Sequence, residues 1–70
     1  MTDRARYHFA VKEGSGGIPW IMLEPMERDL PALQNACLGF DLVEGCSHDE
    51  AFEIARSMNE NLVSMSISPL

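Results

Sequence analysis

Apolar and polar residues alternate near the N-terminus over seven positions. One side of the pattern carries Ala5, Tyr7, Phe9 and Val11, and the other carries Arg6, His8, Ala10 and Lys12. Successive side chains of a β-strand point to opposite faces, so residues 5–11 predict a strand that is buried on one face. A glycine-rich stretch, residues 13–17, separates it from a second apolar run, and together they predict a β-hairpin.

The second run, residues 18–23, is apolar on both faces. Ile18, Trp20 and Met22 share one face, and Ile21 and Leu23 share the other. Such a strand is either covered on both sides or presents one face to a partner. Trp20, Ile21 and Leu23 are therefore the candidates for a protein interface. Trp20 suits two roles equally, as the largest piece of a small core or as an anchor in a protein contact.

Two prolines and four charged residues interrupt the pattern in residues 24–31, which predicts an irregular connection. Asp29 has the right position to cap a single helical turn over residues 32–35. Alternation returns with Leu38, Phe40 and Leu42 on one side. This predicts a third strand that ends before Gly45.

The segment from Ser47 to Leu62 has the period of an amphipathic helix. Six apolar residues fall within one arc at about 100° per residue, namely Ala51, Phe52, Ile54, Ala55, Met58 and Leu62. Ser47 and Glu50 have the spacing of a capping box, in which the serine accepts from a backbone N–H and the glutamate reaches back to the cap. Residues 63–67 alternate again and predict a last strand.

These elements predict a small single α+β domain over residues 1–70, in the order β-β-(short turn)-β-α-β, with residues 1–4 disordered. The helix separates the last two strands, which predicts a crossover with those strands parallel. We therefore expect a four-stranded mixed sheet with the amphipathic helix packed on one face. The other face would carry a mixture of apolar and basic side chains, apolar enough at its centre to suggest a self-contact.

The length of the chain limits how far its own core stabilises it. Seventy residues bury a small fraction of their surface, so a disulfide framework, a metal or a partner subunit usually adds stability. Two cysteines are too few for a disulfide framework. The additional stability would therefore come from a bound metal or from a homodimer.

The charge of the chain argues against a nucleic-acid partner. Eleven acids and five bases give a formal net charge of -6, which repels phosphates unless the bases cluster on one face. The bases are spread along the sequence, at Arg4, Arg6, Lys12, Arg28 and Arg56. No signal peptide or membrane span is visible, so we expect no membrane partner and a cytoplasmic protein with reduced thiols.

Potentially reactive residues gather at residues 45–50, just where the helix begins. Adjacent helical side chains point about 100° apart, so Ser47, His48 and Asp49 do not form a catalytic triad. A metal site would use Cys37, Cys46 and His48, with His8 as a fourth ligand, but this spacing matches no zinc pattern. Cys46 before the cap is also a candidate reactive thiol. The capping box explains most of the cluster, so we expect no catalytic residue and no cofactor.

The helix start also carries a resemblance. A glycine and a small polar cap lead into Asp49-Glu50-Ala51-Phe52-Glu53-Ile54-Ala55, and with the order β-β-β-α-β this is similar to the antitoxin domains of the HicB family. The resemblance implies a domain that neutralises a small ribonuclease toxin. The residues themselves indicate a small acidic protein that is not an enzyme and that works through protein contacts, as a homodimer. The alternatives are a metal-binding or small-ligand domain that uses Cys46 and His48, and the antitoxin role.

Overall fold

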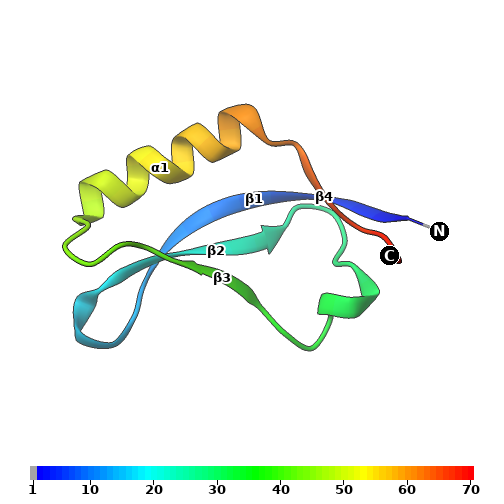
Figure 1. Cartoon of the computed structure of the whole chain (residues 1–70), viewed down its shortest axis with the longest axis horizontal. Helices are drawn as coiled ribbons and strands as arrows, with labels where there is room; N and C mark the ends of the chain where they lie inside the picture. Colours follow the sequence, from blue (N-terminus) through cyan, green and yellow to red (C-terminus); the bar gives the residue numbers. More distant parts are fainter. Residues whose placement is uncertain (1) are drawn as a thin grey trace.

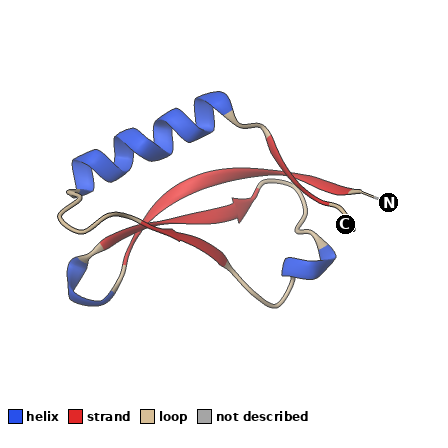
Figure 2. Ribbon diagram, viewed as in Figure 1, coloured by secondary structure: helices blue, strands red, loops and turns tan. Residues whose placement is uncertain are grey.

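The computed structural model describes residues 2–70, which form a curled sheet of four strands and one long helix (Figure 1). The elements are β1 (Asp3–Glu13), β2 (Pro19–Pro25), β3 (Leu38–Asp41), α1 (His48–Asn61) and β4 (Ser64–Ile67). Two short 3-10 turns, at Ser15–Gly17 and Pro31–Leu33, interrupt the connections (Figure 2). The predicted α+β class and element order are confirmed.

The sheet has the strand order β3-β2-β1-β4, and every neighbouring pair is antiparallel. The predicted mixed sheet, with the last two strands parallel, therefore does not form, because β3 and β4 lie at opposite edges. The reason lies in the chain after the helix. Only Leu62 and Val63 separate α1 from β4. The chain does not turn back after α1, so β4 continues in the direction of the helix and pairs antiparallel with β1 (Figure 1).

Pairing with β4 orders the start of the chain. Asp3 faces Ile67 and Arg4 faces Ser66 across the ladder, and the Thr2 and Ser68 hydroxyls lie 2.9 Å apart. The predicted disorder of residues 1–4 thus does not apply to Asp3 and Arg4, while Met1 lies outside the described residues. The sequence pattern missed this because the alternation in residues 63–67 does not tell which strand they join.

The core lies on the apolar face of β1 and β2. Buried apolar side chains come from the hairpin, from the connection after it and from the helix, namely Ala5, Tyr7, Ile21, Leu23, Leu30, Ala51 and Ala55. α1 packs against β1 and β2 through its two alanines, whose small side chains let the helix backbone approach the sheet. Leu30 covers the other end of the same face, beside Tyr7 and Leu23.

Tyr7 fixes the irregular connection between β2 and β3. Its hydroxyl donates to the Asp29 carboxylate at 2.5 Å and accepts the Leu30 backbone N–H at 2.9 Å. Burial and the bond to Asp29 raise the pKa of Tyr7. The prediction that Asp29 caps a turn is wrong, because Leu30 occupies the cap position of the Pro31–Leu33 turn and no side chain caps it.

Asn59 fastens the helix to the edge of the sheet. Its side-chain oxygen accepts the Phe9 backbone N–H at 2.7 Å, and its side-chain nitrogen donates to the Phe9 carbonyl at 2.9 Å. These two hydrogen bonds take the place of backbone bonds to a neighbouring strand, such as β4 provides to β1 as far as Arg6. The side chain of a helix residue thus extends the pairing of β1 beyond Arg6, which faces the first residue of β4.

Candidate functional site

The cluster at the helix start is a capping box. The Ser47 hydroxyl accepts the Glu50 backbone N–H, and the Glu50 carboxylate accepts the Ser47 backbone N–H, both at 3.1 Å. The bond from the Ser47 backbone holds the pKa of Glu50 below its usual range. Cys46 places its sulfur 3.6 Å from the Ser47 carbonyl. Ser47 is thus engaged with the helix backbone, as the sequence spacing predicts.

The structure does not bring the candidate metal ligands together. Cys37 precedes β3 and is exposed, whereas Cys46 follows the loop at the other end of that strand. His48 lies 3.8 Å from the Glu13 carboxylate, and His8 lies 3.0 Å from Glu24 on β1 and β2. Within residues 2–70, no three His, Cys, Asp or Glu side chains form a group able to hold a metal ion.

The three interface candidates have different surroundings. Ile21 is fully buried and Leu23 is 5% exposed, both within the core of the chain itself, so neither side chain is free to meet a partner. Trp20 is half-buried on the opposite face of β2. Its indole ring lies over Gly39 of β3, since a Cβ on Gly39 would come within 2.8 Å of it. Trp20 therefore keeps both a packing role and exposed surface.

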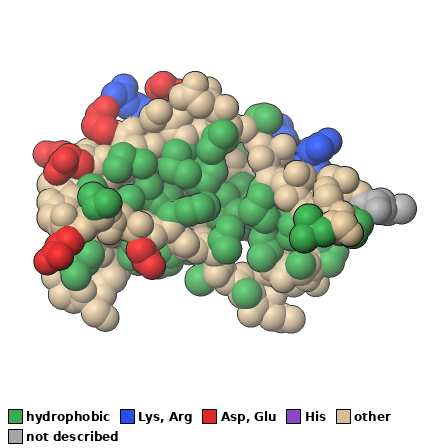
Figure 3. Space-filling view, in the orientation of Figure 1, with side chains coloured by type: hydrophobic (Ala, Val, Ile, Leu, Met, Phe, Trp, Pro, Cys, Tyr) green, Lys and Arg blue, Asp and Glu red, His purple; other side chains and the backbone are tan. Residues whose placement is uncertain are grey.

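The edge strand β3 presents apolar side chains to solvent. All four of its residues are exposed, including Leu38 at 38% and Phe40 at 39%. Phe40 lies beside Phe9, with ring centroids 6.0 Å apart, on the same face of the sheet as the core. Hydrophobic side chains gather across the middle of the face shown in Figure 3, below α1. The helix thus leaves part of the apolar face uncovered.

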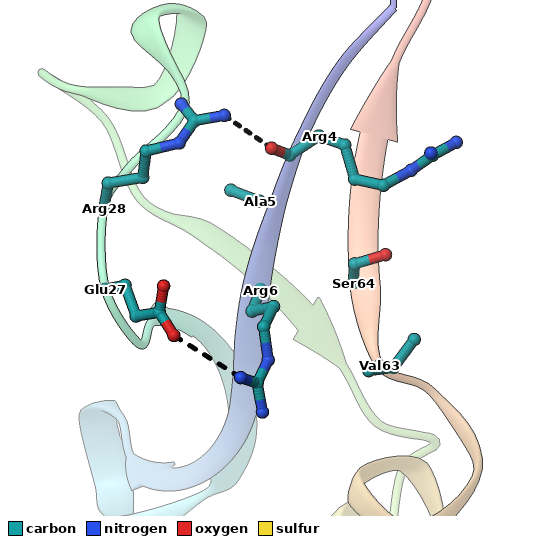
Figure 4. A pocket seen from close by; sticks show the side chains of 7 residues that line it. All are labelled: Arg4, Ala5, Arg6, Glu27, Arg28, Val63 and Ser64. Atoms are coloured by element: carbon teal, nitrogen blue, oxygen red, sulfur yellow. Dashed lines mark hydrogen bonds and ion pairs between the residues drawn. The ribbon is translucent and has the colours of Figure 1, made fainter.

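A second surface feature is a hollow of about 280 Å³ whose lining includes three arginines, with guanidinium groups that point to different sides (Figure 4). We call it the arginine hollow, and its lining consists of Arg4, Ala5, Arg6, Glu27, Arg28, Val63 and Ser64. Arg28 donates to the Arg4 carbonyl at 2.5 Å, and Arg6 lies 3.4 Å from the Glu27 carboxylate. For Arg4 and Arg28, no carboxylate of residues 2–70 lies within ion-pair distance, 4.0 Å.

The sequence interpretation missed this hollow, although part of the signal was present. Arg4, Arg6 and Lys12 all occupy even positions of β1, so the strand places them on one face. Arg28 joins them only because the connection after β2 folds back beside β1, with Met26 donating to the Arg6 carbonyl at 3.1 Å. The bases that are spread along the sequence are thus gathered in space.

Lys12 and His8 share a carboxylate farther along the same face. The Glu24 oxygens lie 2.8 Å from the Lys12 nitrogen and 3.0 Å from the His8 Nε2. The hydrogen bond from Lys12 and the nearby His8 hold the pKa of Glu24 below its usual range. Glu24 therefore neutralises this end of the basic row, and the excess positive charge remains at the arginine hollow.

Comparisons with known proteins give no relative for this chain. No protein-family model, no curated protein and no solved structure matches it. The likeness to HicB antitoxin domains thus rests on the element order and the helix start alone. Among the described residues, no helix has the length and apolar character needed to cross a membrane.

Proposed function

We propose that this chain is a protein-interaction domain that works as a homodimer, with two copies joined through β3. The observation that carries the proposal is the exposure of all four β3 residues beside an uncovered apolar face. An edge strand offers unpaired backbone groups to another strand, and Leu38 and Phe40 offer apolar surface with them. The chain lacks a disulfide, and a second copy adds the burial that a small core needs.

The sequence of β3 complements itself about a two-fold axis. If Gly39 faces Gly39 of a second copy in an antiparallel pair, Leu38 lies opposite Phe40 and the apolar faces of both sheets become continuous. The same register places Asp41 opposite Cys37, so the acids of the two copies do not face each other. This arrangement limits the repulsion that the net charge of -6 creates between copies.

The uncovered face supplies area that a β3 pair alone lacks. A stable interface buries about 800 Å² per partner, and the described chain exposes 5160 Å². Phe9, Leu38 and Phe40 extend the contact from the strand edge onto the face of the sheet. On the other face, Trp20 lies over Gly39 and hence beside the two-fold axis. The proposal thus gives the exposed part of Trp20 an interface role.

Sedimentation equilibrium of the wild type and of Leu38→Lys tests this function. We expect a dimer mass at tens of micromolar, and dissociation at least tenfold easier for Leu38→Lys, because each dimer would place two ammonium groups against apolar surface. Ile18→Lys is the matched control, since Ile18 is an exposed apolar residue in the hairpin tip. A wild type that stays monomeric, or two variants with equal effects, would contradict the proposal.

The fluorescence of Trp20 gives a second readout of the same equilibrium. The chain has one tryptophan, so its emission reports on a single place. Dilution should move the emission to longer wavelength as the dimer separates and water reaches the indole ring. The midpoint should agree with the sedimentation data. We place this dimer in the cytoplasm, where the free thiols of Cys37 and Cys46 stay reduced.

A further inference from the structure

One edge of β1 is open beyond the residues that β4 covers. β4 pairs with residues 3–6 of β1 and leaves the rest of that edge uncovered, whereas β2 pairs along the opposite edge. Alternate residues of an antiparallel strand direct their backbone N–H and carbonyl groups to opposite edges. Phe9 bonds Asn59 at the open edge, so Val11 and Glu13 direct their groups to the same edge. No strand of the described chain pairs with these two residues there.

The helix makes this open edge one wall of a groove. The first residue of α1 lies 3.8 Å from the Glu13 carboxylate, and the helix runs along β1 until Asn59 reaches Phe9 (Figure 1). The groove has a volume of about 530 Å³, and its lining includes Val11 and Phe52. Phe52 is 58% exposed. The groove thus combines open backbone groups with an exposed aromatic ring.

The contact of Asn59 shows which kind of group fits the edge. Its side-chain amide offers one donor and one acceptor, as a peptide unit of a neighbouring strand does, and it bonds both backbone groups of Phe9. An extended polypeptide that lies between Asn59 and the hairpin tip would bond Val11 and Glu13 in the same way. The open backbone groups therefore favour an extended polypeptide over a helix or a small apolar ligand.

The charges beside the groove indicate the sign of its partner. Glu13 lies at one end and Glu60 lines the groove at the other, beyond Asn59. Arg56 also lines the groove, but it pairs with Glu53. These side chains leave an excess of negative charge, as does the whole chain at -6. A second copy would bring acids against acids, whereas a basic segment is attracted.

We propose that this groove binds an extended basic segment of another protein, which adds a strand to β1. The backbone of the segment bonds Val11 and Glu13, and an apolar side chain packs on Phe52. A basic side chain two residues away points to the same side and lies beside Glu13. A second basic residue meets Glu60 where the segment leaves the groove. The site goes beyond the proposed dimer, since β3 forms the opposite side of the sheet.

The experiment is a titration of the full chain with the blocked pentapeptide Lys-Ser-Val-Ser-Lys, followed by amide hydrogen exchange in NMR. We expect exchange at the Val11 and Glu13 amides to slow in a saturable manner, because the peptide backbone accepts their hydrogens. Exchange at Ala10 and Lys12, whose backbone groups face β2, should change little. Protection that appears only at β3, or evenly over the molecule, would overturn the proposal.

Two control peptides separate strand addition from attraction by charge alone. Glu-Ser-Val-Ser-Glu keeps the apolar residue and reverses the charge, so it should bind much more weakly at the same ionic strength. Equal binding would overturn the choice of a basic segment. Lys-Lys-Val-Ser-Ser keeps the composition but moves one lysine to the other side of the strand. If it gives the same affinity and the same protection, the alternating pattern has no role and the proposed geometry is wrong.

Variants of the groove test its two walls. Phe52→Ser should weaken peptide binding about fivefold or more, because a truncated aromatic anchor costs at least that much. Ile54→Ser is the matched control, since Ile54 is an exposed apolar residue about 160° away round the same helix. Val11→Pro removes an N–H that lies outside the β1–β2 ladder, and a folded variant should lose binding. Equal effects of the two serine variants would overturn the proposal, whether or not Val11→Pro folds.

The mass of the serine variants without peptide distinguishes a foreign segment from a second copy. We expect Phe52→Ser to have the same mass as the wild type in sedimentation. If this variant alone dissociates a wild-type dimer, a second copy fills the groove and the proposal of a foreign segment is overturned.

Discussion

The hydroxyl of the buried Tyr7 makes two hydrogen bonds. It donates to Asp29 and accepts from Leu30, whose side chain is fully buried. The alternation of residues 5–11 places Tyr7 on the buried face, but the sequence does not show which groups satisfy its hydroxyl. Both partners lie more than 20 residues away along the chain. One side chain thus holds the connection that leads from β2 to β3.

Replacing Tyr7 with Phe should lower the free energy of unfolding by about 1–3 kcal/mol. The change leaves the buried Leu30 N–H without its acceptor and removes one hydrogen bond of the half-buried Asp29 carboxylate, and an unpaired buried group costs about that much. Because the folded pKa of Tyr7 is raised, its stabilising effect is complete below pH 10.0, its ordinary value, and disappears as pH rises through the raised pKa. Urea unfolding at pH 7 measures the loss, and an unchanged midpoint would contradict this role.

Glu24 should make the free energy of unfolding depend on pH in the acid range. Lys12 and His8 lower its folded pKa, so the contribution is present above about pH 4.5, its ordinary value, and is lost as pH falls through the lowered pKa. The group is exposed in part, so we expect Glu24→Gln to cost about 0.5–1 kcal/mol at pH 7. Thermal melts at pH 7 and pH 3 test this. The difference between wild type and variant should be smaller at pH 3 than at pH 7, and a constant difference would contradict the prediction.

At the scale of the elements, local patterns identify strands and helix better than they identify neighbours. Alternation predicts the hairpin, and the 3.6-residue period with Ser47 and Glu50 predicts where α1 begins, because these signals lie within short segments. The partner of β4 depends on the path of the chain through Leu62 and Val63, which no period encodes. The contact of Asn59 with Phe9 is equally hard to predict from sequence, because a polar residue near a helix end usually faces water.

Asn59→Ala should loosen α1 from the sheet. Two hydrogen bonds to the Phe9 backbone are lost, and at about 0.5–1.5 kcal/mol each the helix loses about 1–3 kcal/mol of its attachment. Hydrogen exchange at the Phe9 amide should therefore accelerate by about tenfold or more. Asn61→Ala is the control, because Asn61 bonds only to Ser57 of the same helix. Equal acceleration in both variants would show that Asn59 has no special attachment.

The proposed dimer contact and the arginine hollow lie at opposite edges of the molecule. β3 ends the sheet on one side, while β4 and the first part of β1 border the arginine hollow on the other. A dimer joined through β3 therefore leaves both arginine hollows uncovered. The even positions of Arg4 and Arg6 in β1 predict from sequence that they share a face. Arg28 joins them only because the connection after β2 folds back beside β1. The exposure of Leu38 and Phe40 likewise follows from β3 being an edge strand, which the pattern does not reveal.

The most direct test of the account is the distance between two nitroxide labels on Cys37 in a Cys46→Ser variant. Cys37 is an exposed thiol next to β3, so the label reports on this edge. With Gly39 at the two-fold axis, the two Cys37 Cα atoms lie about 14 Å apart, from about 3.4 Å per residue and about 4.8 Å between strands. We predict strong dipolar broadening that mixing with unlabelled protein removes. Spectra without intermolecular coupling, at concentrations where the mass is that of a dimer, would contradict pairing through β3.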